Sequence, residues 1–483
     1  MEKYILTIDA GTTGLTVILF DDKLKIIDKE YSELSQIYPK ENWVEHDPTE
    51  LIDKIEFSVD KITKKHLTKN ITSIGITNQR ESVVVWNKKT GKPVYNTIVW
   101  QCKRTNDFCK SLKKEKKSVF IKTGLYIDSY FSATKLKWII DNVKCAKQLL
   151  ENDKLIFGTV DTWIIWNLTN GKKHLTDFTN ASRTLLYNIN DKKWDKELLK
   201  LFKIPKKILP KVKNSIDNYG IYHKYNLPIN AVAGDQQAAL FGQGCFKKGN
   251  SKCTYGTGLF FLMNTGKNRI DSKNMLITTL SIDEKGKPNY AIEGSVFIGG
   301  AIIQWLRDEL KLIRRASETE KISESVNDSN GVYIVPAFVG LGAPYWKPDT
   351  KGLITGLTRN SNYKHIIRAA LESIAFQAQD LFSAISKDFN HNIKDLYVDG
   401  GATNNNFLMQ FQSNISDVTI IKPNNIESTS VGVCIMSGLK SKIWPNANVA
   451  FKNKKIEKIY KSKISNKNRK QHLENWKLAV EKV

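Results

Sequence analysis

The sequence predicts an α/β fold built from two related halves. Strand-like apolar runs alternate with helical patterns along the chain, as is typical of α/β proteins. A short Gly/Thr turn leads into an apolar run twice, at residues 11–20 and again at residues 256–263. A Gly- and Lys-rich passage at residues 242–251 divides the 483 residues into two similar lengths. At roughly 150 residues per domain, two or three globular domains are expected.

The first half of the sequence opens with three expected strands, at residues 4–8, 15–20 and 26–33. A turn of Gly and Thr at residues 11–14 joins the first strand to the second, so we expect a hairpin there. Walker and Rossmann phosphate loops both lead from a strand into a helix, whose N-terminus meets the phosphate. The hairpin therefore excludes both of these nucleotide-binding arrangements.

Alternating helices and strands follow the hairpin. Helices are expected at residues 49–64, 134–150 and 195–201, and apolar strands at 71–76, 83–86 and 154–157. In the second half, a strand that ends at Asp399 leads through Gly400 and Gly401 into a helix around residues 407–411. The Lys- and Asn-rich sequence beyond Leu439 predicts a surface extension that ends in a helix at about residues 469–480.

The charge of the chain is strongly positive. It has 74 Lys and Arg residues against 49 Asp and Glu residues, a formal charge of +25, and only ten of the cations are Arg. Bidentate recognition of phosphates and bases favours Arg. The lysines are spread along the sequence and are not interleaved with aromatic residues in a stacking pattern. The charge therefore indicates a solvated, Lys-rich surface rather than a specific nucleic-acid site.

The six cysteines include no C-x-x-C pair and no histidine at metal-ligand spacing, so we expect reduced and mostly structural thiols. Residues 1–6 pass directly into an apolar strand, without the basic segment and cleavage site of a secretion signal. No stretch approaches the roughly 18 apolar residues of a membrane span. These features predict a cytosolic protein without an integral membrane segment.

Three Gly-centred turns, at residues 9–13, 255–258 and 399–402, can each present backbone N–H groups to a phosphate. Successive amides with no side chain in the way form an anion-binding concavity, although each turn taken alone is better explained as an ordinary hairpin turn. Asp9 ends the first strand beside the first of these turns. Because Mg²⁺ is usually bound by one or two carboxylates together with waters and substrate phosphates, Asp9 is a candidate Mg²⁺ contact.

Two further polar groups follow expected buried strands. Arg80 and Glu81 are adjacent at the end of one strand, where they could form a structural ion pair or a polyol clamp in which Arg80 donates to hydroxyls and Glu81 accepts from them. Asp235 follows the apolar segment 229–233 and precedes two glutamines. It could cap a helix, or it could take the proton from a substrate alcohol.

Together these motifs resemble the FGGY carbohydrate-kinase family, and within it the members that act on glycerol. The resemblance covers almost the whole chain. The runs Gly-Ile-Thr-Asn-Gln-Arg-Glu at residues 75–81 and Gly-Asp-Gln-Gln-Ala-Ala-Leu-Phe-Gly-Gln at 234–243 are highly specific. The other matching segments are 9–13, 43–48, 98–102, 130–135, 158–163, 254–258, 304–309, 335–346, 352–372 and 399–412.

The resemblance implies two actin/hexokinase-like (ribonuclease-H-like) domains with a nucleotide and substrate cleft between them. Residues 1–243 would form the N-terminal domain with the polyol site and the phosphate hairpin, and residues 244–440 the C-terminal domain with the adenine-nucleotide site. Residues 441–483 would form a Lys-rich extension with a terminal helix. The implied activity is ATP-dependent phosphorylation of glycerol to sn-glycerol 3-phosphate, which serves glycerol uptake and catabolism and the supply of lipid precursors.

The resemblance also assigns roles to individual residues. The implied glycerol-binding residues are Arg80, Glu81, Trp100, Tyr130, Asp235, Gln236 and Phe260, with Trp100 and Phe260 covering the carbon backbone and Asp235 as the catalytic base. The implied nucleotide-binding residues are Thr12, Thr13, Gly14, Thr257, Gly300, Gln304, Gly401 and Asn405, and Asp9 is the implied Mg²⁺ contact. ATP and Mg²⁺ are the expected cofactors, and a cytoplasmic homo-oligomer, a dimer or a tetramer, without a specific nucleic-acid partner is the expected assembly.

Some positions depart from the family pattern. Ala10 stands where Gln is common, Thr16 where many members carry an Arg near the phosphates, and Ser129 where Pro is usual. One of the many lysines could supply the missing charge near Thr16 as a point charge. The segment 219–230 is short and lacks the Gly- and Arg-bearing insertion that some bacterial members have there.

Two alternative functions remain open from the sequence. The first is an FGGY kinase for another small polyol or sugar, which would share the nucleotide residues. Aromatic side chains at Trp100 and Phe260 favour a three-carbon polyol over a larger sugar. The second is a non-catalytic actin-like ATPase, because fold alone does not define function. The presence of Arg80, Glu81 and Asp235 argues against it.

Overall fold

The computed structural model describes residues 2–345, 347, 349–389 and 392–483. Met1 and Trp346, which belong to segments discussed above, lie outside the described residues. The chain divides into two compact units. The first unit contains residues 1–246, 278–290 and 428–453, and the second contains residues 247–277, 291–427 and 454–483. Both units combine β-strands with helices, which confirms the predicted α/β fold.

The first unit is built on a six-stranded sheet with the strand order β13-β14-β5-β1-β2-β3. Strands β1, β2 and β3 form an antiparallel meander, whereas β1, β5 and β14 run parallel to one another. The predicted hairpin is therefore confirmed. The strand bounds are β1 (Tyr4–Ala10), β2 (Gly14–Asp21), β3 (Ile26–Glu33), β5 (Ile71–Asn78), β13 (Ile221–Tyr222) and β14 (Leu227–Gly234).

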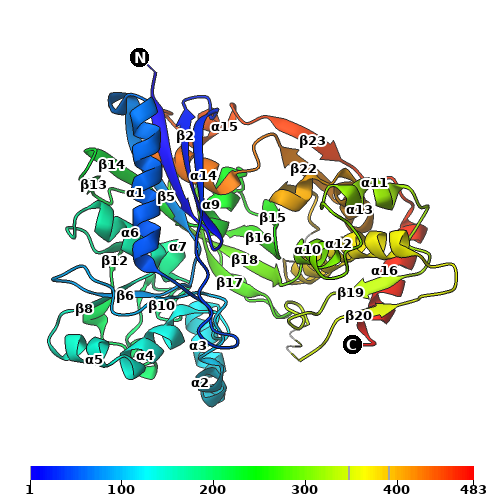
Figure 1. The fold of residues 1–483 in the computed structure, drawn as a ribbon, viewed down its shortest axis with the longest axis horizontal. Coiled ribbons are helices and arrows are strands. Elements are labelled where there is room, and N and C mark those ends of the chain that lie inside the picture. Colours follow the sequence, from blue (N-terminus) through cyan, green and yellow to red (C-terminus); the bar gives the residue numbers. More distant parts are fainter. Residues whose placement is uncertain (1, 346, 348, 390–391) are drawn as a thin grey trace. The chain divides into compact units, whose positions relative to one another are not determined.

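Alternating side chains of this sheet enter two separate cores. Leu6 and Ile8 pack in one core with apolar residues of helices α1 (Pro48–Lys65) and α6 (Val160–Leu168). Ile5 and Ile18 pack in the other core with helices α9 (Asp235–Gly242) and α14 (Ser428–Lys440). This division follows from the two-residue period of a strand, which points successive side chains to opposite faces. Figure 1 shows the long helix α1 running along the strands of this sheet.

Helices α9 and α14 approach each other and the sheet closely through glycines. A Cβ added at Gly432 would come within 2.0 Å of the carbonyl oxygen of Ala238 in α9, and one added at Gly242 within 2.1 Å of that of Ser428. A Cβ at Gly75, in the central strand β5, would meet the carbonyl oxygen of Val433 at 2.4 Å. Side chains at these positions would separate the layers. Helix α14 therefore belongs to the first unit although it lies late in the sequence.

The second unit contains most of a seven-stranded sheet with the order β17-β18-β16-β15-β21-β22-β23. Strands β15 and β16 pair antiparallel, β15, β21 and β22 run parallel, and β23 pairs antiparallel with β22. A hairpin followed by two parallel neighbours repeats the pattern of the first unit and confirms the prediction of two related halves. The strand bounds are β15 (Ser251–Tyr255), β16 (Leu259–Gly266), β17 (Ile277–Ile282), β18 (Pro288–Val296), β21 (Asp395–Asp399), β22 (Thr419–Pro423) and β23 (Ile456–Tyr460).

The Lys-rich C-terminal segment, residues 441–483, is mostly exposed, and a few buried side chains anchor it to the two units. Trp444 is only 5% exposed within the first unit, and Trp476 of helix α16 (Asn466–Val480) is 2% exposed within the second. The ring of Trp476 stacks on Phe376 of helix α12 (Tyr363–Phe389) with a centroid distance of 5.1 Å. Composition indicates the many exposed lysines of this segment but not the few large apolar side chains that anchor it.

One predicted helix is two helices. In place of a single helix at 134–150, the chain forms α4 (Ser132–Asn142) and α5 (Lys144–Glu151), separated by Val143 in an extended conformation with φ −104° and ψ 106°. The N–H groups of Ala146 and Lys147 both bond to the carbonyl of Val143, so this residue ends one helix and starts the next. The other predicted helices are confirmed as α1, α8 (Lys196–Leu201), α13 (Asn406–Ser416) and α16.

The remaining elements are smaller. In the first unit they are β4 (Glu45–His46), β6 (Val84–Asn87), β7 (Thr97–Ile98), α2 (Asn106–Ser111), α3 (Lys116–Thr123), β8 (Leu155–Gly158), β9 (Leu175–Asp177), α7 (Phe178–Ala181), β10 (Tyr187–Asn188), β11 (Lys193–Trp194), β12 (Lys211–Lys213) and α15 (Ala447–Phe451). In the second unit they are α10 (Ala301–Asp308), α11 (Glu318–Glu324), β19 (Tyr333–Val335) and β20 (Leu353–Thr355). Among the described residues, we find no helix with both the length and the apolar character needed to span a membrane.

Candidate active site

The predicted site residues of the first unit emerge from one edge of its sheet. Ala10, Asn78 and Gly234 lie level across the parallel strands β1, β5 and β14. The residues that follow them are the hairpin 11–14, the run 79–81 and Asp235. In open α/β sheets, ligands bind outside the carboxyl ends of the strands, where the loops converge. The topology therefore brings the phosphate hairpin, the predicted clamp and the predicted base to the same edge.

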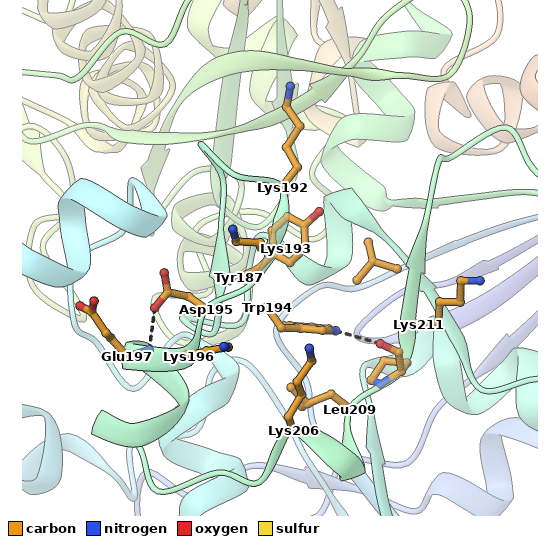
Figure 2. A pocket seen from close by; sticks show the side chains of 12 residues that line it. Tyr187, Lys192, Lys193, Trp194, Asp195, Lys196, Glu197, Lys206, Leu209 and Lys211 are labelled. Carbon is orange, nitrogen blue, oxygen red and sulfur yellow. Dashed lines mark hydrogen bonds between the residues drawn. The ribbon is translucent and has the colours of Figure 1, made fainter.

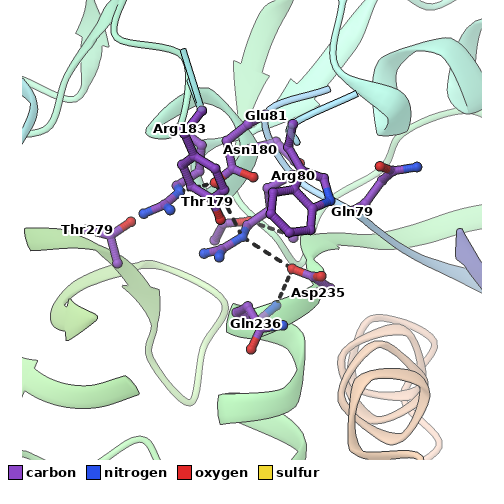
Figure 3. A network of polar contacts seen from close by, with 12 residues as sticks. Gln79, Arg80, Glu81, Thr179, Asn180, Arg183, Asp235, Gln236 and Thr279 are labelled. Atoms are coloured by element: carbon purple, nitrogen blue, oxygen red, sulfur yellow. Dashed lines mark hydrogen bonds and ion pairs between the residues drawn. The ribbon is translucent and has the colours of Figure 1, made fainter. Parts of the chain in front are cut away.

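Arg80 connects the predicted clamp to the predicted base. Its Nε lies 3.2 Å from Oδ1 of Asp235 and 3.7 Å from Oε1 of Glu81, and its Nη1 donates to Oε1 of Gln237 at 3.1 Å. Glu81 is bound more tightly by a second cation, Arg183, whose Nε lies 2.5 Å from Oε1. Figure 3 shows these side chains converging. Arg80, Glu81 and Arg183 are each at most 2% exposed, so the charges form a buried and paired network.

Asp235 is the most accessible carboxylate of this network. It is the first residue of α9, and Gly234 holds the N-cap position, so the alternative of an Asp235 N-cap is not realised. Its Oδ1 accepts a hydrogen bond from the backbone N–H of Gln236 at 2.7 Å. The side chain is 27% exposed, against 2% for Arg80. Asp235 is thus oriented by a fixed donor and a cation while it remains open to a substrate hydroxyl.

Trp100 joins the clamp side of the site to the phosphate hairpin. Its indole Nε1 donates to Oγ1 of Thr12 at 2.8 Å, and its ring meets Tyr130 edge to face at a centroid distance of 5.4 Å. The backbone N–H of Trp100 is held by Oγ of Ser82, immediately after Glu81. With its donor engaged by Thr12, the indole presents apolar ring surface, which suits contact with a carbon chain.

A buried lysine fixes the loop that carries Tyr130. Nζ of Lys135 donates to the carbonyl oxygens of Ser129, Tyr130 and Phe131 at 2.8, 2.6 and 2.9 Å. Lys135 has no exposed surface, and burial lowers its pKa to about 7. Three carbonyl acceptors match the three donors of an ammonium group, and together these contacts orient the loop.

The phosphate hairpin is a tight turn with little room for larger side chains. The N–H of Gly11 bonds to the carbonyl of Gly14 at 3.0 Å, and a Cβ at Gly14 would lie 2.5 Å from the hydroxyl of Tyr31. Thr13 is exposed, whereas Thr12 is half-buried. Asp9 pairs with Thr16 across the β1–β2 ladder, and its Oδ2 accepts from Oγ1 of Thr429 in α14 at 2.5 Å.

The predicted nucleotide residues of the second unit gather around its own hairpin. The N–H groups of Gly299 and Gly300 bond to the carbonyls of Thr257 and Gly256 at 2.7 and 2.8 Å. Gly400, with φ 89°, packs against the hairpin strand so closely that a Cβ would lie 2.5 Å from the carbonyl oxygen of Tyr255. The structure thus brings Thr257, Gly300 and the turn at Gly400 and Gly401 together within this unit.

The other predicted residues of the second unit lie near these turns or on its surface. Asn405 caps α13 by accepting from the N–H of Leu408 at 2.9 Å, and its Nδ2 donates to Thr319. Gln304 of α10 is exposed, and Phe260 of β16 is half-buried. The predicted site residues are therefore divided between the units. Those of the polyol side, apart from Phe260, are assembled in the first unit, and the second unit contributes Phe260 and the remaining nucleotide residues.

Sequence reasoning missed Arg183, Asn180 and Thr179, which support the clamp from behind. All three are fully buried, although they lie in a polar run, residues 179–184, that looks like a surface loop. The residues just before the run, 172–177, include a single apolar side chain, Leu175, so the sequence gives no clear signal that the run is buried. A run of polar residues becomes buried only when each finds a partner, and sequence does not show partners.

The described residues contain no cluster of three or more His, Cys, Asp or Glu side chains that could enclose a metal ion. This agrees with the chemistry of Mg²⁺, which usually takes one or two protein carboxylates and completes its shell with water and phosphate oxygens. Asp9, half-buried at the end of β1 beside the phosphate hairpin, is a donor of the appropriate type.

A separate pocket of about 710 Å³ lies elsewhere in the first unit and contains none of the predicted site residues (Figure 2). Its wall includes Trp194, whose indole nitrogen donates to the carbonyl of Pro210 at 2.9 Å. Several lysines line it, and its two acidic residues, Asp195 and Glu197, are both paired with Lys122.

The chain has full-length relatives among known proteins. The chain is 50% identical over 495 residues to glycerol kinase of Clostridium botulinum strain 657, covering 100% of this chain and 99% of that protein. It is also 50% identical over 493 residues to glycerol kinase of Clostridium perfringens strain 13, covering 100% of this chain and 98% of that protein.

Solved structures share the fold. The crystal structure of Plasmodium falciparum glycerol kinase with ADP matches with a TM-score of 0.93 at 38% identity, over 100% of this chain and 98% of that chain. Xylulose kinase from Lactobacillus acidophilus matches with a TM-score of 0.87 at 23% identity, over 99% of this chain and 97% of that chain, which shows the common fold alone.

Two family domains cover most of the sequence. The N-terminal domain of the FGGY family of carbohydrate kinases matches residues 4–242, and the C-terminal domain of that family matches residues 251–440. With both domains present in order and full-length relatives at 50% identity, this chain belongs to the FGGY family of carbohydrate kinases.

Proposed function

We propose that this protein is a kinase that transfers the γ-phosphoryl group of ATP to a terminal hydroxyl of glycerol, giving sn-glycerol 3-phosphate and ADP. The observation that carries the proposal is the convergence of Arg80, Glu81 and Asp235 at the carboxyl edge of the sheet, beside the phosphate hairpin. Full-length relatives named glycerol kinase support the same substrate. The product would serve glycerol catabolism and the supply of lipid precursors.

The polyol would be held by a pair of opposite charges. Arg80 offers guanidinium donors and Glu81 offers carboxylate acceptors, so adjacent hydroxyls can both be satisfied. Tyr130 and Gln236 would add polar contacts, while Trp100 and Phe260 would cover the carbon atoms. A small polyol fits this proposal, because the buried ion network and the Trp100–Tyr130 pair limit the space on the first-unit side of the site.

Asp235 would act as the general base. As the hydroxyl oxygen of glycerol bonds to the γ-phosphorus, the bond from that phosphorus to the bridging oxygen of ADP breaks, and the hydroxyl proton passes to the Asp235 carboxylate. A base in this position must lie within hydrogen-bond reach of the hydroxyl. The donor from Gln236 and the cation of Arg80 keep the carboxylate in one orientation before the transfer.

The nucleotide would be bound by both hairpins. Thr12, Thr13 and Gly14 would contact its phosphates from the first unit, and the second unit would contribute Thr257, Gly300, Gln304, Gly401 and Asn405. Asp9 would hold Mg²⁺, which neutralises phosphate charge when it is bound. Positioning and charge neutralisation account for most of the catalysis in phosphoryl transfer. Hydroxyls and backbone amides that are already fixed in turns suit this task.

The assembly and compartment complete the proposal. We infer a cytoplasmic homo-oligomer, a dimer or a tetramer, without a specific nucleic-acid partner. Light scattering of the purified protein, measured together with size-exclusion chromatography, would give the number of chains directly, and a monomer at micromolar concentration would contradict this part of the proposal.

A coupled assay of ADP release across a panel of polyols and sugars tests the function. Glycerol should stimulate turnover of Mg-ATP, and chromatography of the product should identify glycerol 3-phosphate. A much higher kcat/KM with a pentose, a hexitol or gluconate would assign the protein to another FGGY kinase activity. ATP hydrolysis at the same rate with and without polyol would instead favour an actin-like ATPase that phosphorylates no polyol.

A further inference from the structure

One short segment of the first unit contacts three of the segments that carry proposed glycerol-binding residues: those with Asp235, with Arg80 and Glu81, and with Tyr130. This segment, residues 177–184, contains helix α7 and the turn that follows it. Oγ1 of Thr179 accepts from the N–H of Gly234, next to Asp235, at 2.8 Å. The side chain of Asn180 exchanges two hydrogen bonds with that of Asn78, at 2.9 and 3.1 Å. The carbonyl of Thr184 accepts from the N–H of Ala133 at 2.9 Å.

The segment is itself fixed by a buried carboxylate. Asp177 caps α7 by accepting from the N–H groups of Thr179 and Asn180 at 3.0 and 2.9 Å. It also accepts from the hydroxyl of Ser215 at 2.7 Å. Asp177 has no exposed surface. A network in which each buried polar group has a partner restricts its members to one arrangement. The hydrogen bonds of Asp177 therefore hold the start of the segment in one orientation.

Arg183 connects this segment to Glu81 of the proposed polyol clamp. Its Nε lies 2.5 Å from Oε1 of Glu81, much closer than the 3.7 Å between Nε of Arg80 and the same oxygen. Its guanidinium also lies over the rings of Tyr130 and Phe131, 5.7 and 5.2 Å from their centroids. One cation therefore contacts two of the proposed glycerol-binding residues at once, from the buried side.

The backbone at Glu81 needs such support. Its φ is +64°, in the left-handed region that residues other than Gly rarely adopt. Residues held in this region persist only when the surrounding structure fixes them. The hydroxyl of Ser132 donates to the carbonyl of Glu81 at 3.0 Å, and Arg183 holds its carboxylate. Both ends of this residue are thus fixed by partners outside its own loop.

We propose that Arg183 is a positioning residue for glycerol binding, which acts by holding Glu81 and Tyr130 in the geometry that accepts the polyol. This inference rests on the proposed function. Arg80 is occupied by Asp235 and Gln237, so it is poorly placed to orient Glu81 alone. Arg183 is the cation that holds the Glu81 carboxylate in a single direction, and it does so from a side-chain position with no solvent exposure.

The simplest opposing view is that Arg183 only stabilises the fold, and the first unit contains a matched pair with which to test it. Nη2 of Arg104 lies 2.5 Å from Oε1 of Glu45. The side chains of Arg104 and Glu45 are 0% and 2% exposed, the same values as for Arg183 and Glu81. The guanidinium of Arg104 also lies on an aromatic ring, 3.8 Å from the centroid of Trp43. Neither member of this pair is among the proposed glycerol-binding residues.

The first experiment compares Arg183→Lys and Arg183→Gln with Arg104→Lys and Arg104→Gln. Melting temperature without ligand reports the structural cost, and KM for glycerol, KM for ATP and kcat report function. We expect Arg183→Gln to raise KM for glycerol by about ten- to a hundredfold, the loss seen when partners that orient ligands at metal sites are removed. KM for ATP should change little. Arg183→Lys should recover part of the loss, because it keeps the charge.

The Arg104 variants should lower the melting temperature without changing KM for glycerol. If the Arg183 and Arg104 variants change KM for glycerol equally, or if Arg183→Gln leaves it unchanged, Arg183 has no positioning role. If both Arg183 variants fail to fold while the Arg104 variants fold, its role is structural and the proposal is again wrong. Absence of glycerol-dependent turnover in the unmodified protein would instead contradict the proposed function.

The second experiment asks whether Arg183 acts through Glu81. Glycerol binding is measured from the increase in melting temperature that glycerol causes. This increase reports affinity without the need for turnover. Arg183→Gln is introduced into the unmodified protein and into Glu81→Gln. We expect Arg183→Gln to weaken glycerol binding in the first case. In the second case it should add less than about twofold, because the carboxylate through which Arg183 acts is already gone and mutations in one network are not additive. The full effect in both backgrounds would overturn the proposal.

Discussion

At the scale of single residues, Asp235 and Arg80 are joined by an ion pair of 3.2 Å but are proposed to act at different stages. Asp235→Asn keeps the shape and one acceptor but removes the group that takes the proton. We expect kcat to fall by about 10²–10⁴-fold, the usual contribution of a general base, with a smaller change in glycerol binding. Steady-state kinetics with glycerol as the varied substrate would measure this. Near-normal kcat with a raised KM would make Asp235 a binding residue only.

Arg80→Ala should show the opposite pattern. It removes the donors proposed for the glycerol hydroxyls and leaves Asp235 and Gln237 without a cationic partner. We therefore expect KM for glycerol to rise strongly, by about tenfold or more, because unpaired buried polar groups are costly, while KM for ATP stays close to that of the unmodified protein. The same kinetic series measures both constants. A selective rise in KM for ATP would contradict the assignment of Arg80 to the polyol.

Another residue-scale prediction concerns pH. Asp161 is fully buried, and burial, followed by the nearby charge of Asp177, raises its pKa from 3.8 to about 7. Between about pH 4 and pH 7, the carboxyl group of Asp161 therefore stays protonated in the folded protein and is ionised in the unfolded chain. The stability that results is present below about pH 4 and is lost as the pH rises through 7. Asp161→Asn does not ionise, so relative to the unmodified protein it should gain stability between pH 4 and pH 8.

Urea unfolding at pH 5 and pH 8 would measure this gain. We expect the difference between the two proteins to change by at least about 1 kcal/mol, since one pKa unit corresponds to about 1.4 kcal/mol. Asp141→Asn is the control, because its carboxylate is 48% exposed and pairs with Lys137 at the surface. A stability difference for Asp161→Asn that is the same at both pH values would show that this carboxyl is ionised in the folded protein.

At the scale of secondary-structure elements, the contact between α9 and α14 is the tightest part of the first unit. Gly432→Ala places a Cβ within 2.0 Å of the carbonyl oxygen of Ala238, so the helices must separate. We expect a loss of about 1–3 kcal/mol in the free energy of unfolding, as for other overpacked cores. Denaturant unfolding would measure the loss. Lys440→Ala, at the exposed end of α14, should change it by less than about 0.5 kcal/mol.

Elements with a clear period could be predicted from the sequence, and those defined by a single residue could not. The three strands at the N-terminus alternate or are fully apolar and end in turn residues, and their predicted positions agree with β1, β2 and β3. The break at Val143 has no such signal. The periodic pattern continues through it, and only the backbone conformation of one residue separates α4 from α5.

The candidate site shows the same limit. Arg80, Glu81 and Asp235 were identifiable because each follows an apolar run that becomes a parallel strand, and strand ends meet at one sheet edge. Arg183 follows no such strand. It reaches Glu81 because α7 is folded back under the clamp by the hydrogen bonds of Asp177 and Asn180, contacts that depend on the tertiary structure.

At the scale of the whole molecule, the charge of +25 predicts weak and non-specific attraction to polyanions. DNA binding seen at low salt should disappear near physiological ionic strength, because scattered lysines give a screened interaction. Fluorescence anisotropy with labelled duplexes at several salt concentrations would measure this. Sequence-selective binding that persisted at about 200 mM salt would show that the surface contains a real nucleic-acid site.

The return of α14 to the first unit bears on how the protein is made. A nascent chain that has just emerged up to residue 246 contains every strand of the first sheet, yet residues 428–453 are still to be translated. Until they arrive, the side of the sheet with Ile5 and Ala231 lacks the cover of α14. At about 5–20 residues per second, that interval is on the order of ten seconds or more. Folding of the first unit is thus completed only near the end of translation. If a ribosome stalls before codon 428, the apolar surface that α14 would cover stays exposed to chaperones and proteases.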